Sequence, residues 1–412
     1  MDKMEIMAPA GSYEALQAAI NAGANSVYFG IEQLNMRARA ANNFTIEDLK
    51  KIVEICQNKN VKTYLTLNTI MYDHDINLMK KICDTAKEVG LTAVICSDVA
   101  AMSYAHSINL EVHISTQANV SNIETVKFYS QFADVVVLAR ELTLQQIKRI
   151  TEQVKEQNIK GPKGELVEIE IFVHGALCVA ISGKCYMSLA TYNSSANRGA
   201  CLQNCRRSYK LVDEETGDEL VVDNKYIMSP KDLCTIGFID KILETGVKVL
   251  KIEGRGRSPE YVHTVVTVYR EAVDSFLNGS YDKDKIAHWI TELEKVFNRG
   301  FWHGGYYLGK QLGEWSGVYG SKATKEKIYL GRAKNYFTQP KIGEFHLETG
   351  EINEGDEIII TGPTTGVIQT TVGSIFVNEK KTDSAVKGQE VTIPIENKIR
   401  ANDKLFKVID VA

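Results

Sequence analysis

Four cysteines lie close together in the middle of this 412-residue chain, at Cys178, Cys185, Cys201 and Cys205. They make up half of the eight cysteines in the sequence, and six, fifteen and three residues separate them. Thiolates are preferred protein ligands of zinc and of iron–sulfur clusters. Glycines and other small residues flank these positions, which leaves the backbone free to wrap around a compact centre. The pattern predicts that the four side chains bind a metal centre.

The spacing leaves the kind of centre open. Structural zinc sites usually pair ligands that are about two to four residues apart, and only Cys201 and Cys205 follow that rule. The longer gap between Cys178 and Cys185 is unusual for a zinc ribbon and acceptable for an iron–sulfur loop. Cys234 is a further thiol that could replace one of the four ligands.

The overall composition is that of an ordinary globular protein, with 44% hydrophobic and 24% charged residues. The formal net charge of -4 gives no global positive field, so contact with a nucleic acid would need a local basic patch. The first fifteen residues contain no apolar leader, and no apolar run is long enough to span a membrane. We therefore expect a cytoplasmic protein with no membrane partner, in which cysteines are ligands or catalytic groups rather than disulfides. The oligomeric state stays open.

Short apolar runs alternate with helical patterns over the first three quarters of the chain. Eight of these runs predict strands, at residues 5–10, 26–30, 62–68, 93–98, 111–116, 134–139, 168–175 and 247–254. Among the intervening helices, Ser12 and Thr45 are the expected N-caps of the first two, and Gly23 is the expected C-cap of the first. Strands that alternate with helices favour parallel βαβ units, and eight such units favour a (β/α)8 TIM-like barrel. An open doubly wound sheet is the alternative.

Two domains are expected. Residues 1–328 form the TIM-like barrel, with a Cys-rich insertion at 176–246 that contains a hairpin turning near Gly217. Residues 329–412 change to short alternating strands with turn signals, which predicts a small C-terminal all-β barrel domain.

In a barrel of this kind the active site lies at the carboxyl ends of the strands. The polar residues at those ends that we expect to be catalytic are His174, Glu253, Arg140 and Gln117. Those that we expect to bind substrate are Arg37, Arg39, Asn68 and Arg255. Arginines bind carboxylates through paired, charge-assisted bonds, so this set suits a small anionic substrate. The structural alternatives are a rim ion pair between Glu253 and Arg255 and plain solvation of the loop arginines.

A second group of arginines lies among the clustered cysteines. Arg198, Arg206 and Arg207 belong to a stretch from 198 to 210 that contains no acidic residue, and such a local patch can hold phosphates. The aromatic residues of FWHGGYY, at 301–307, could stack on an unpaired base or belong to the core. His113, inside the fifth expected strand, is interpreted as a core residue.

Several catalytic motifs are missing from the sequence. It contains no H-E-x-x-H, no G-x-S-x-G, no glycine-rich nucleotide loop, and no C-x3-C-x2-C. These gaps leave zincin-type peptidase and α/β-hydrolase chemistry unsupported.

Longer segments resemble a known family. APAGSYEALQAAINAGANSVYFG, EIFVHGALCVAISGKCYMS, NRGACLQNCRRSY, SPKDLC and LKIEGRGRSPEYV are together similar to the collagenase-like peptidase family U32. The resemblance implies oxygen-independent hydroxylation with a 4Fe–4S cluster on Cys178, Cys185, Cys201 and Cys205. It is strongest to the prephenate-dependent group that forms 5-hydroxyuridine at wobble position 34 of tRNA. On that resemblance, tRNA is the expected partner and prephenate the expected anionic co-substrate.

Three other readings stay open. Members of the family also hydroxylate ribosomal RNA or quinone precursors. The family name, taken literally, implies a peptidase whose cysteine nucleophile would be activated by His174. The third reading is a non-catalytic RNA-binding protein with a purely structural cluster.

Overall fold

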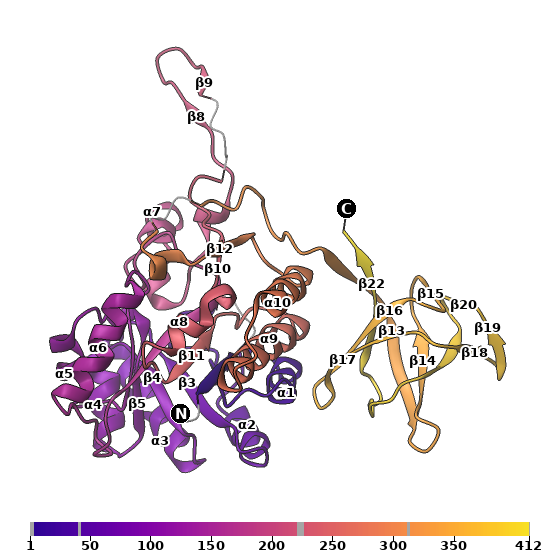
Figure 1. Ribbon diagram of the computed structural model, residues 1–412, viewed down its shortest axis with the longest axis horizontal. Coiled ribbons are helices and arrows are strands. Elements are labelled where there is room, and N and C mark those ends of the chain that lie inside the picture. Colours follow the sequence, from indigo (N-terminus) through magenta and orange to yellow (C-terminus); the bar gives the residue numbers. More distant parts are fainter. Residues whose placement is uncertain (1–3, 40–42, 221–225, 311–313, 412) are drawn as a thin grey trace.

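Eight parallel strands between Glu5 and Ile252 close into a ring. They are β1 (Glu5–Pro9), β2 (Ser26–Phe29), β3 (Lys62–Leu67), β4 (Ala93–Cys96), β5 (Glu111–Ile114), β6 (Val135–Val137), β7 (Glu168–Gly175) and β11 (Val249–Ile252). Neighbours in sequence pair in parallel, and β11 pairs with both β7 and β1, which closes the barrel (Figure 1). The computed structural model describes residues 4–39, 43–220, 226–310 and 314–411. The predicted TIM-like barrel is confirmed, and the doubly wound alternative is wrong.

Helices cover the outside of the ring. They are α1 (Tyr13–Asn21), α2 (Asp48–Gln57), α3 (Ile76–Glu88), α4 (Val99–Ser107), α5 (Ile123–Tyr129), α6 (Leu144–Glu156), α8 (Ile239–Leu243), α9 (Pro259–Leu277) and α10 (Lys283–Lys295). The hydroxyl of Ser12 caps α1 by accepting from the amide of Ala15 at 3.2 Å, as predicted. The expected cap of α2 is wrong. That helix begins after Glu47, because Thr45 uses its amide and hydroxyl to bind the carboxylate of Asp48.

The interior of the barrel contains a buried ion pair. The ammonium of Lys251 lies 2.7 Å from the carboxylate of Glu170, and the two side chains are 6% and 0% exposed. The same ammonium lies 4.7 Å from the ring centre of Tyr28. The second oxygen of Glu170 has no hydrogen-bond partner among the described residues. The pair therefore joins β7 to β11, the two strands that close the ring.

The predicted insertion leaves the barrel between β7 and β11. It contains α7 (Met187–Tyr192), a short hairpin of β8 (Leu211–Val212) and β9 (Glu219–Leu220), and β10 (Asp232–Cys234). β10 runs antiparallel to β7, and β12 (Phe301–His303) pairs in parallel with β10. The hairpin turns at Gly217, where φ is +78°, as predicted, and it projects away from the barrel (Figure 1). The last part of the predicted hairpin, 221–225, lies outside the described residues.

The C-terminal part of the chain is all-β. Its strands are β13 (Lys325–Phe337), β14 (Ile342–Leu347), β15 (Glu351–Asn353), β16 (Glu357–Gly362), β17 (Gly366–Thr371), β18 (Ile375–Val377), β19 (Lys380–Thr382), β20 (Ser384–Val386), β21 (Glu390–Pro394) and β22 (Lys404–Asp410). Eight of them form one antiparallel sheet with β17 and β19 at its ends, and strands near both ends contribute to a single buried core. The predicted all-β character is confirmed.

The all-β domain packs on the first and last helices of the barrel. Ile359 and Val367 bury Ala18 of α1, and Lys327 pairs with Glu260 of α9 at 2.8 Å. A side chain at Gly366 would collide with the backbone of α1. Figure 1 shows the domain on the α1 and α9 side of the barrel. Within the described residues, none of the helices has the length and apolar character needed to cross a membrane.

Replacing Lys251 by Met should leave the carboxylate of Glu170 buried without its partner. Breaking one side of a buried pair typically costs about 3–5 kcal/mol, so we expect the free energy of unfolding in urea to fall by that amount. The exposed Arg149 of α6, which pairs with Glu156, provides the control, and Arg149→Ala should change stability by less than about 1 kcal/mol.

A double variant tests the cause. Lys251→Met combined with Glu170→Leu removes both charges, and it should be more stable than Lys251→Met alone. A double variant that loses as much stability as the two single variants together would show that the charges do not act as a pair.

Candidate functional site

The carboxyl ends of the barrel strands open into a cavity of about 250 Å³. Tyr28, Thr66, Phe172 and Lys251 come from strands β2, β3, β7 and β11, and the Cys-rich insertion forms the opposite wall. Parallel strands of a barrel present their carboxyl ends on one face, which is where such enzymes hold their sites. The insertion covers part of this open face and so deepens it into a pocket.

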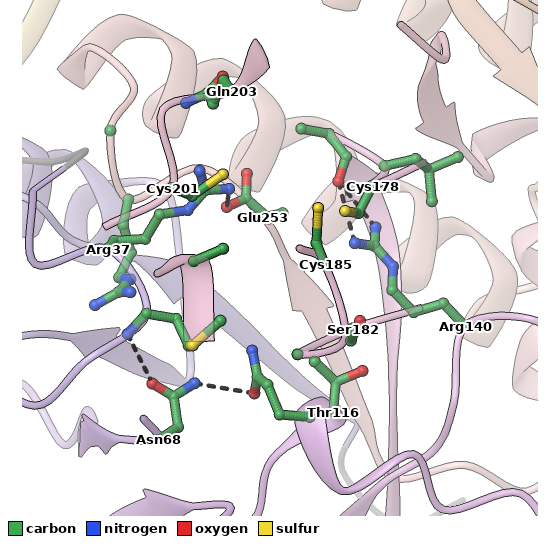
Figure 2. Close-up of a pocket in the computed structure, with 18 of the residues that line it drawn as sticks. Arg37, Asn68, Thr116, Arg140, Cys178, Ser182, Cys185, Cys201, Gln203 and Glu253 are labelled. Atoms are coloured by element: carbon green, nitrogen blue, oxygen red, sulfur yellow. Dashed lines mark hydrogen bonds and ion pairs between the residues drawn. The ribbon is translucent and has the colours of Figure 1, made fainter. Parts of the chain in front are cut away.

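Most of the predicted site residues meet in this cavity. Those that line it are Arg37, Asn68, Gln117, Arg140, Cys178, Cys185, Cys201, Cys205, Arg206, Glu253 and Arg255. Figure 2 shows several of them facing a common space. The structure therefore brings together residues that are more than 200 positions apart in the sequence.

The lining of the cavity is strongly cationic. Its basic side chains are Arg37, Arg140, Arg206, Lys251, Arg255, Arg257 and Arg299. Glu253 is the only carboxylate among the described residues that line it. The charge excess favours an anionic occupant.

Glu253 and Arg37 form an ion pair across the cavity wall, with Arg37 Nη2 donating to Glu253 Oε1 at 2.9 Å. Burial acts to raise the pKa of Glu253, but Arg37, Arg257 and Arg140 outweigh it and hold the pKa below its usual value. The carboxylate of Glu253 in turn raises the pKa of Arg37. Glu253 is therefore ionised and acts as an acceptor rather than as an acid.

Arg255 is buried behind this pair. Its Nη1 donates to Asn35 Oδ1 at 3.1 Å and to Thr66 Oγ1 at 2.8 Å, and burial lowers its pKa to about 10. A Cβ atom at Gly30 would lie only 2.4 Å from the same nitrogen. A side chain at position 30 would therefore require the guanidinium and the side chain of Asn35 to move.

Arg140 and Arg206 fasten the loop that carries Cys178. Both terminal nitrogens of Arg140 donate to the carbonyl of Ala176 at 3.1 Å, and the guanidinium stacks on Phe172 at 4.5 Å. Arg206 donates to the carbonyl of Leu177 and, at 2.7 Å, to that of Pro230. We predicted catalysis for Arg140 and substrate binding for Arg206, and the geometry gives both a positioning role.

A polar network forms the side of the cavity next to β3 and β5. Asn68 Nδ2 donates to Gln117 Oε1 at 3.1 Å and to Ser115 Oγ at 3.2 Å, and Asn68 Oδ1 accepts from the amide of Met36 at 3.2 Å. The buried hydroxyl of Thr116 has no partner among the described residues. The network holds Gln117 in the lining of the cavity, where its amide can donate to an occupant.

The four clustered cysteines all line the cavity as free thiols. Cys178 is exposed and the other three are partly buried. Burial raises the pKa of Cys205, Arg206 opposes that rise, and Cys178, Cys201 and Cys185 add to it, so the four sulfur atoms share one electrostatic environment. Within the described ranges, no three His, Cys, Asp or Glu side chains are close enough to hold a metal ion. The donor set and the shared cavity suit a sulfur-ligated centre, but the side chains are not arranged around one.

His174 does not reach the cavity. Its ring is buried among Tyr261, Tyr269 and Phe301, with ring centres 5.5 to 6.1 Å away. Its Nδ1 lies 3.4 Å from the hydroxyl of Tyr269. Burial, helped by the charge of Arg257, lowers its pKa to about 3. The geometry therefore does not support the expected catalytic role of His174. Its side chain packs against these aromatic rings, at the position where β10 pairs with β7, and not in the cavity.

Three predicted substrate-binding arginines also lie outside the cavity lining. Arg39 is exposed. Arg198 pairs with the carboxylate of Asp75 and stacks on a tyrosine ring, and Arg207 is exposed beside Tyr192. These side chains belong to the outer rim of the site rather than to its interior.

Three cations of the cavity are not among the predicted site residues. Lys251 is recognisable from the sequence only as a polar residue at the end of the eighth expected strand, and it lies on β11, which Glu253 follows directly. Arg257 lies on the loop that follows β11 and stacks on Phe297 at 3.5 Å. Arg299 reaches the cavity only because β12 pairs with β10, and nothing in the local sequence indicates that pairing.

The aromatic stretch FWHGGYY is mainly structural. Phe301, Trp302 and Tyr307 are buried, and the hydroxyl of Tyr307 donates to the carbonyl of Phe172 at 2.5 Å. The core interpretation of these three rings is favoured over base stacking. His113 is likewise buried, and it contacts Glu111 at 3.2 Å near the opposite end of the barrel.

Comparisons with known proteins place these features in a family context. The family model described as peptidase family U32 matches residues 11–317. A protein named collagenase from Porphyromonas gingivalis is 58% identical over 407 residues, which cover 99% of this chain and 98% of that protein.

Two RNA-modifying proteins are also similar to the chain. A tRNA hydroxylation protein of Bacillus subtilis is 30% identical over 418 residues, which cover 98% of this chain and 95% of that protein. A 23S rRNA 5-hydroxycytidine synthase of Escherichia coli is 32% identical over 305 residues, which cover 72% of this chain and 44% of that protein. Proteins named for peptide cleavage and for RNA hydroxylation are therefore both similar to this chain.

The buried His174 should make the protein sensitive to acid. Its pKa falls from 6.5 to about 3 on folding, so between those values the unfolded chain binds a proton that the folded chain does not. Stability present above pH 6.5 should fall by about 1.4 kcal/mol for each pH unit below it. His174→Gln should flatten this part of the curve in urea unfolding, whereas the exposed His288→Gln should not. Parallel curves for the wild type and His174→Gln would contradict the assignment.

Proposed function

The chain belongs to peptidase family U32, and we propose that it hydroxylates a base of RNA rather than cleaving peptides. The product that we propose is 5-hydroxyuridine at wobble position 34 of tRNA. The net change inserts one oxygen atom into the C5–H bond of uridine to give C5–OH. The base loses two electrons, and the small-molecule oxygen donor that supplies the atom gains them.

One observation carries the proposal: four thiols line the same cationic cavity at the mouth of the barrel. A peptidase needs one nucleophile with a base beside it, whereas four thiols in one lining are the donor set of an iron–sulfur centre. The proposal combines this donor set with a pocket suited to an anion.

The proposed cofactor is a 4Fe–4S cluster on Cys178, Cys185, Cys201 and Cys205. When bound, the cluster would supply electron transfer or Lewis-acid activation. Arg206 is near these ligands, and its charge partly opposes the rise in the pKa of Cys205 that burial causes. Arg140 holds the carbonyl of Ala176, two residues before Cys178, and so limits where the first ligand can lie.

The proposed co-substrate is prephenate, a small dicarboxylate. The charge excess of the lining supports it, since Arg255 and Arg257 line the cavity and Glu253 is neutralised by Arg37. Paired guanidinium–carboxylate bonds would fix its orientation. The amide of Gln117 would supply a neutral donor to the bound molecules.

The substrate class is supported by the relatives. The Bacillus subtilis protein is named for tRNA hydroxylation, and its similarity extends over nearly the whole of both chains. The Escherichia coli protein acts on 23S rRNA, but this chain covers less than half of it. Full-length similarity thus favours tRNA over ribosomal RNA, and a quinone precursor has no support among these relatives.

A peptidase is the second candidate, because the collagenase of Porphyromonas gingivalis is far more similar in sequence. A cysteine peptidase would require a base next to one of the four thiols. Among the described residues that line the cavity, none is a histidine or an aspartate, and Glu253 is already paired with Arg37. The site chemistry therefore argues against this candidate.

Loss of a cluster ligand should remove the metal. We expect protein purified without oxygen to contain iron and acid-labile sulfide, and Cys201→Ser to lose most of both. Cys56→Ala changes a buried thiol on α2, away from the cavity, and should keep them. Wild-type protein with zinc in place of iron, or with no metal, would contradict the proposed cofactor.

The reaction itself is checked on the nucleosides of cellular tRNA. A deletion strain should lack 5-hydroxyuridine and its derivatives by mass spectrometry, and the wild-type gene should restore them. Glu253→Gln should reduce the modification by about 100-fold or more, because it removes the charge that holds Arg37 at the cavity. Glu156→Gln, on the outer face of α6, serves as the control. Unchanged wobble uridine in the deletion strain would exclude the proposed reaction.

A further inference from the structure

Several large apolar side chains on the Cys-rich insertion, and on segments that interact with its arginines, are exposed. They are Tyr72, Ile181, Tyr186, Tyr192, Leu202 and Tyr319, which we call the rim. Ile181 itself lines the cavity, and Tyr186 and Leu202 are each adjacent to one of the cysteines that line it. Tyr186 and Tyr319 are 70% and 74% exposed, values far outside those of core aromatics. Exposed aromatic residues gathered at a site mark a binding surface.

Two of the rim tyrosines carry a guanidinium on their ring. Arg198 lies 4.1 Å from the ring centre of Tyr72, and its pairing with Asp75 fixes that position. Arg207 lies 5.1 Å from the ring centre of Tyr192 and also interacts electrostatically with Tyr319. These are the two predicted arginines of the Cys-rich insertion that the cavity itself does not use. Each of these two rings is therefore paired with a flat cation.

The part of the insertion that forms most of the rim is positively charged. Residues 176–210 contain Lys184, Arg198, Arg206, Arg207 and Lys210 and no aspartate or glutamate, although the chain as a whole has a net charge of -4. Arg198 pairs with Asp75 and Lys210 with Glu219, so the excess positive charge comes from Lys184, Arg206 and Arg207. A local patch of this sign attracts phosphates. A surface that binds an apolar protein partner does not require an excess of basic over acidic residues.

Together these features specify one kind of partner. Proteins that bind unpaired nucleic acid combine basic grooves for the backbone with aromatic rings on which successive bases stack. We infer that the rim binds an unpaired loop of RNA, with bases stacked on Tyr72 and Tyr192 while the target base enters the cavity between them. An enzyme that acts on a base must remove it from its stack, and the stacking rings on the rim would replace the lost neighbours.

The inference rests on the proposed function, and it is tested by binding rather than turnover. Fluorescence anisotropy with the full-length, iron-loaded protein compares a stem–loop RNA, whose loop contains a uridine, with a fully paired hairpin of equal length. The stem–loop should bind at least about 10-fold more tightly. Tyr72→Ala and Tyr192→Ala should each weaken stem–loop binding by about 5- to 100-fold and leave the iron content unchanged. Tyr72→Phe and Tyr192→Phe should retain binding, because the ring rather than the hydroxyl provides the stacking.

Phe128→Ala supplies the matched control, since Phe128 is an equally exposed ring on α5 outside the rim. Equal affinity for the two RNAs, or rim variants that bind as the wild type does, would overturn the inference. Tighter binding of a labelled collagen-like peptide, weakened by the same rim variants, would overturn it in favour of a peptide partner. Loss of tRNA modification in cells with normal stem–loop binding would instead count against the proposed chemistry and leave the rim assignment standing.

Discussion

Several arginines are buried at the mouth of the barrel, and their positive charge has to be balanced by negative charge. This requirement links the arginines, Glu253, the cysteines and the anionic occupant that the cavity suits. Burial lowers the pKa of Arg206, Arg255 and Arg257, which shows that enclosing these cations is costly. Glu253 neutralises Arg37, Glu170 pairs with Lys251 and Asp232 pairs with Arg299. Among the described residues of the lining, the cations left in excess are Arg140, Arg206, Arg255 and Arg257. The balance must come from anions that enter or form there, and thiolates, carboxylates and phosphates are the chemical classes that the proposed function brings to this space.

The topology explains how such a cavity can exist. A parallel ring leaves its carboxyl end open, and the chain uses one long insertion to cover it. Arg140 and Arg206 hold the first turn of that insertion by its carbonyl groups. Gly199 allows a second contact, because a Cβ atom there would lie 2.3 Å from the carbonyl of Asn35. The insertion is therefore fixed to the barrel at both sides of the cavity, so that its cysteines face the strand ends.

The sequence revealed the barrel and much of the site, for identifiable physical reasons. Buried parallel strands are short, apolar and regularly separated by amphipathic helices, so all eight were found, and residues at their carboxyl ends, such as Asn68 and Glu253, share a face by topology. The errors arise where a strand gains a neighbour outside the ring. Pairing of β10 on β7 covers His174, and pairing of β12 on β10 buries Trp302 and brings in Arg299. Such non-local pairings leave no periodic signal in the sequence.

Overall sequence similarity and the chemistry of the cavity point to different functions, and the chemistry is the better guide to mechanism. High identity to a protein named collagenase shows a shared fold and a shared set of residues, and it carries no mechanism by itself. Peptide cleavage by a thiol needs one sulfur atom activated by a base, and none of the described residues that line this cavity is a histidine. His174, the base that the sequence suggested, is enclosed by three aromatic rings and has a pKa near 3. A buried imidazole of that basicity cannot activate a thiol across the barrel wall, so the peptidase reading loses the residue on which it depended.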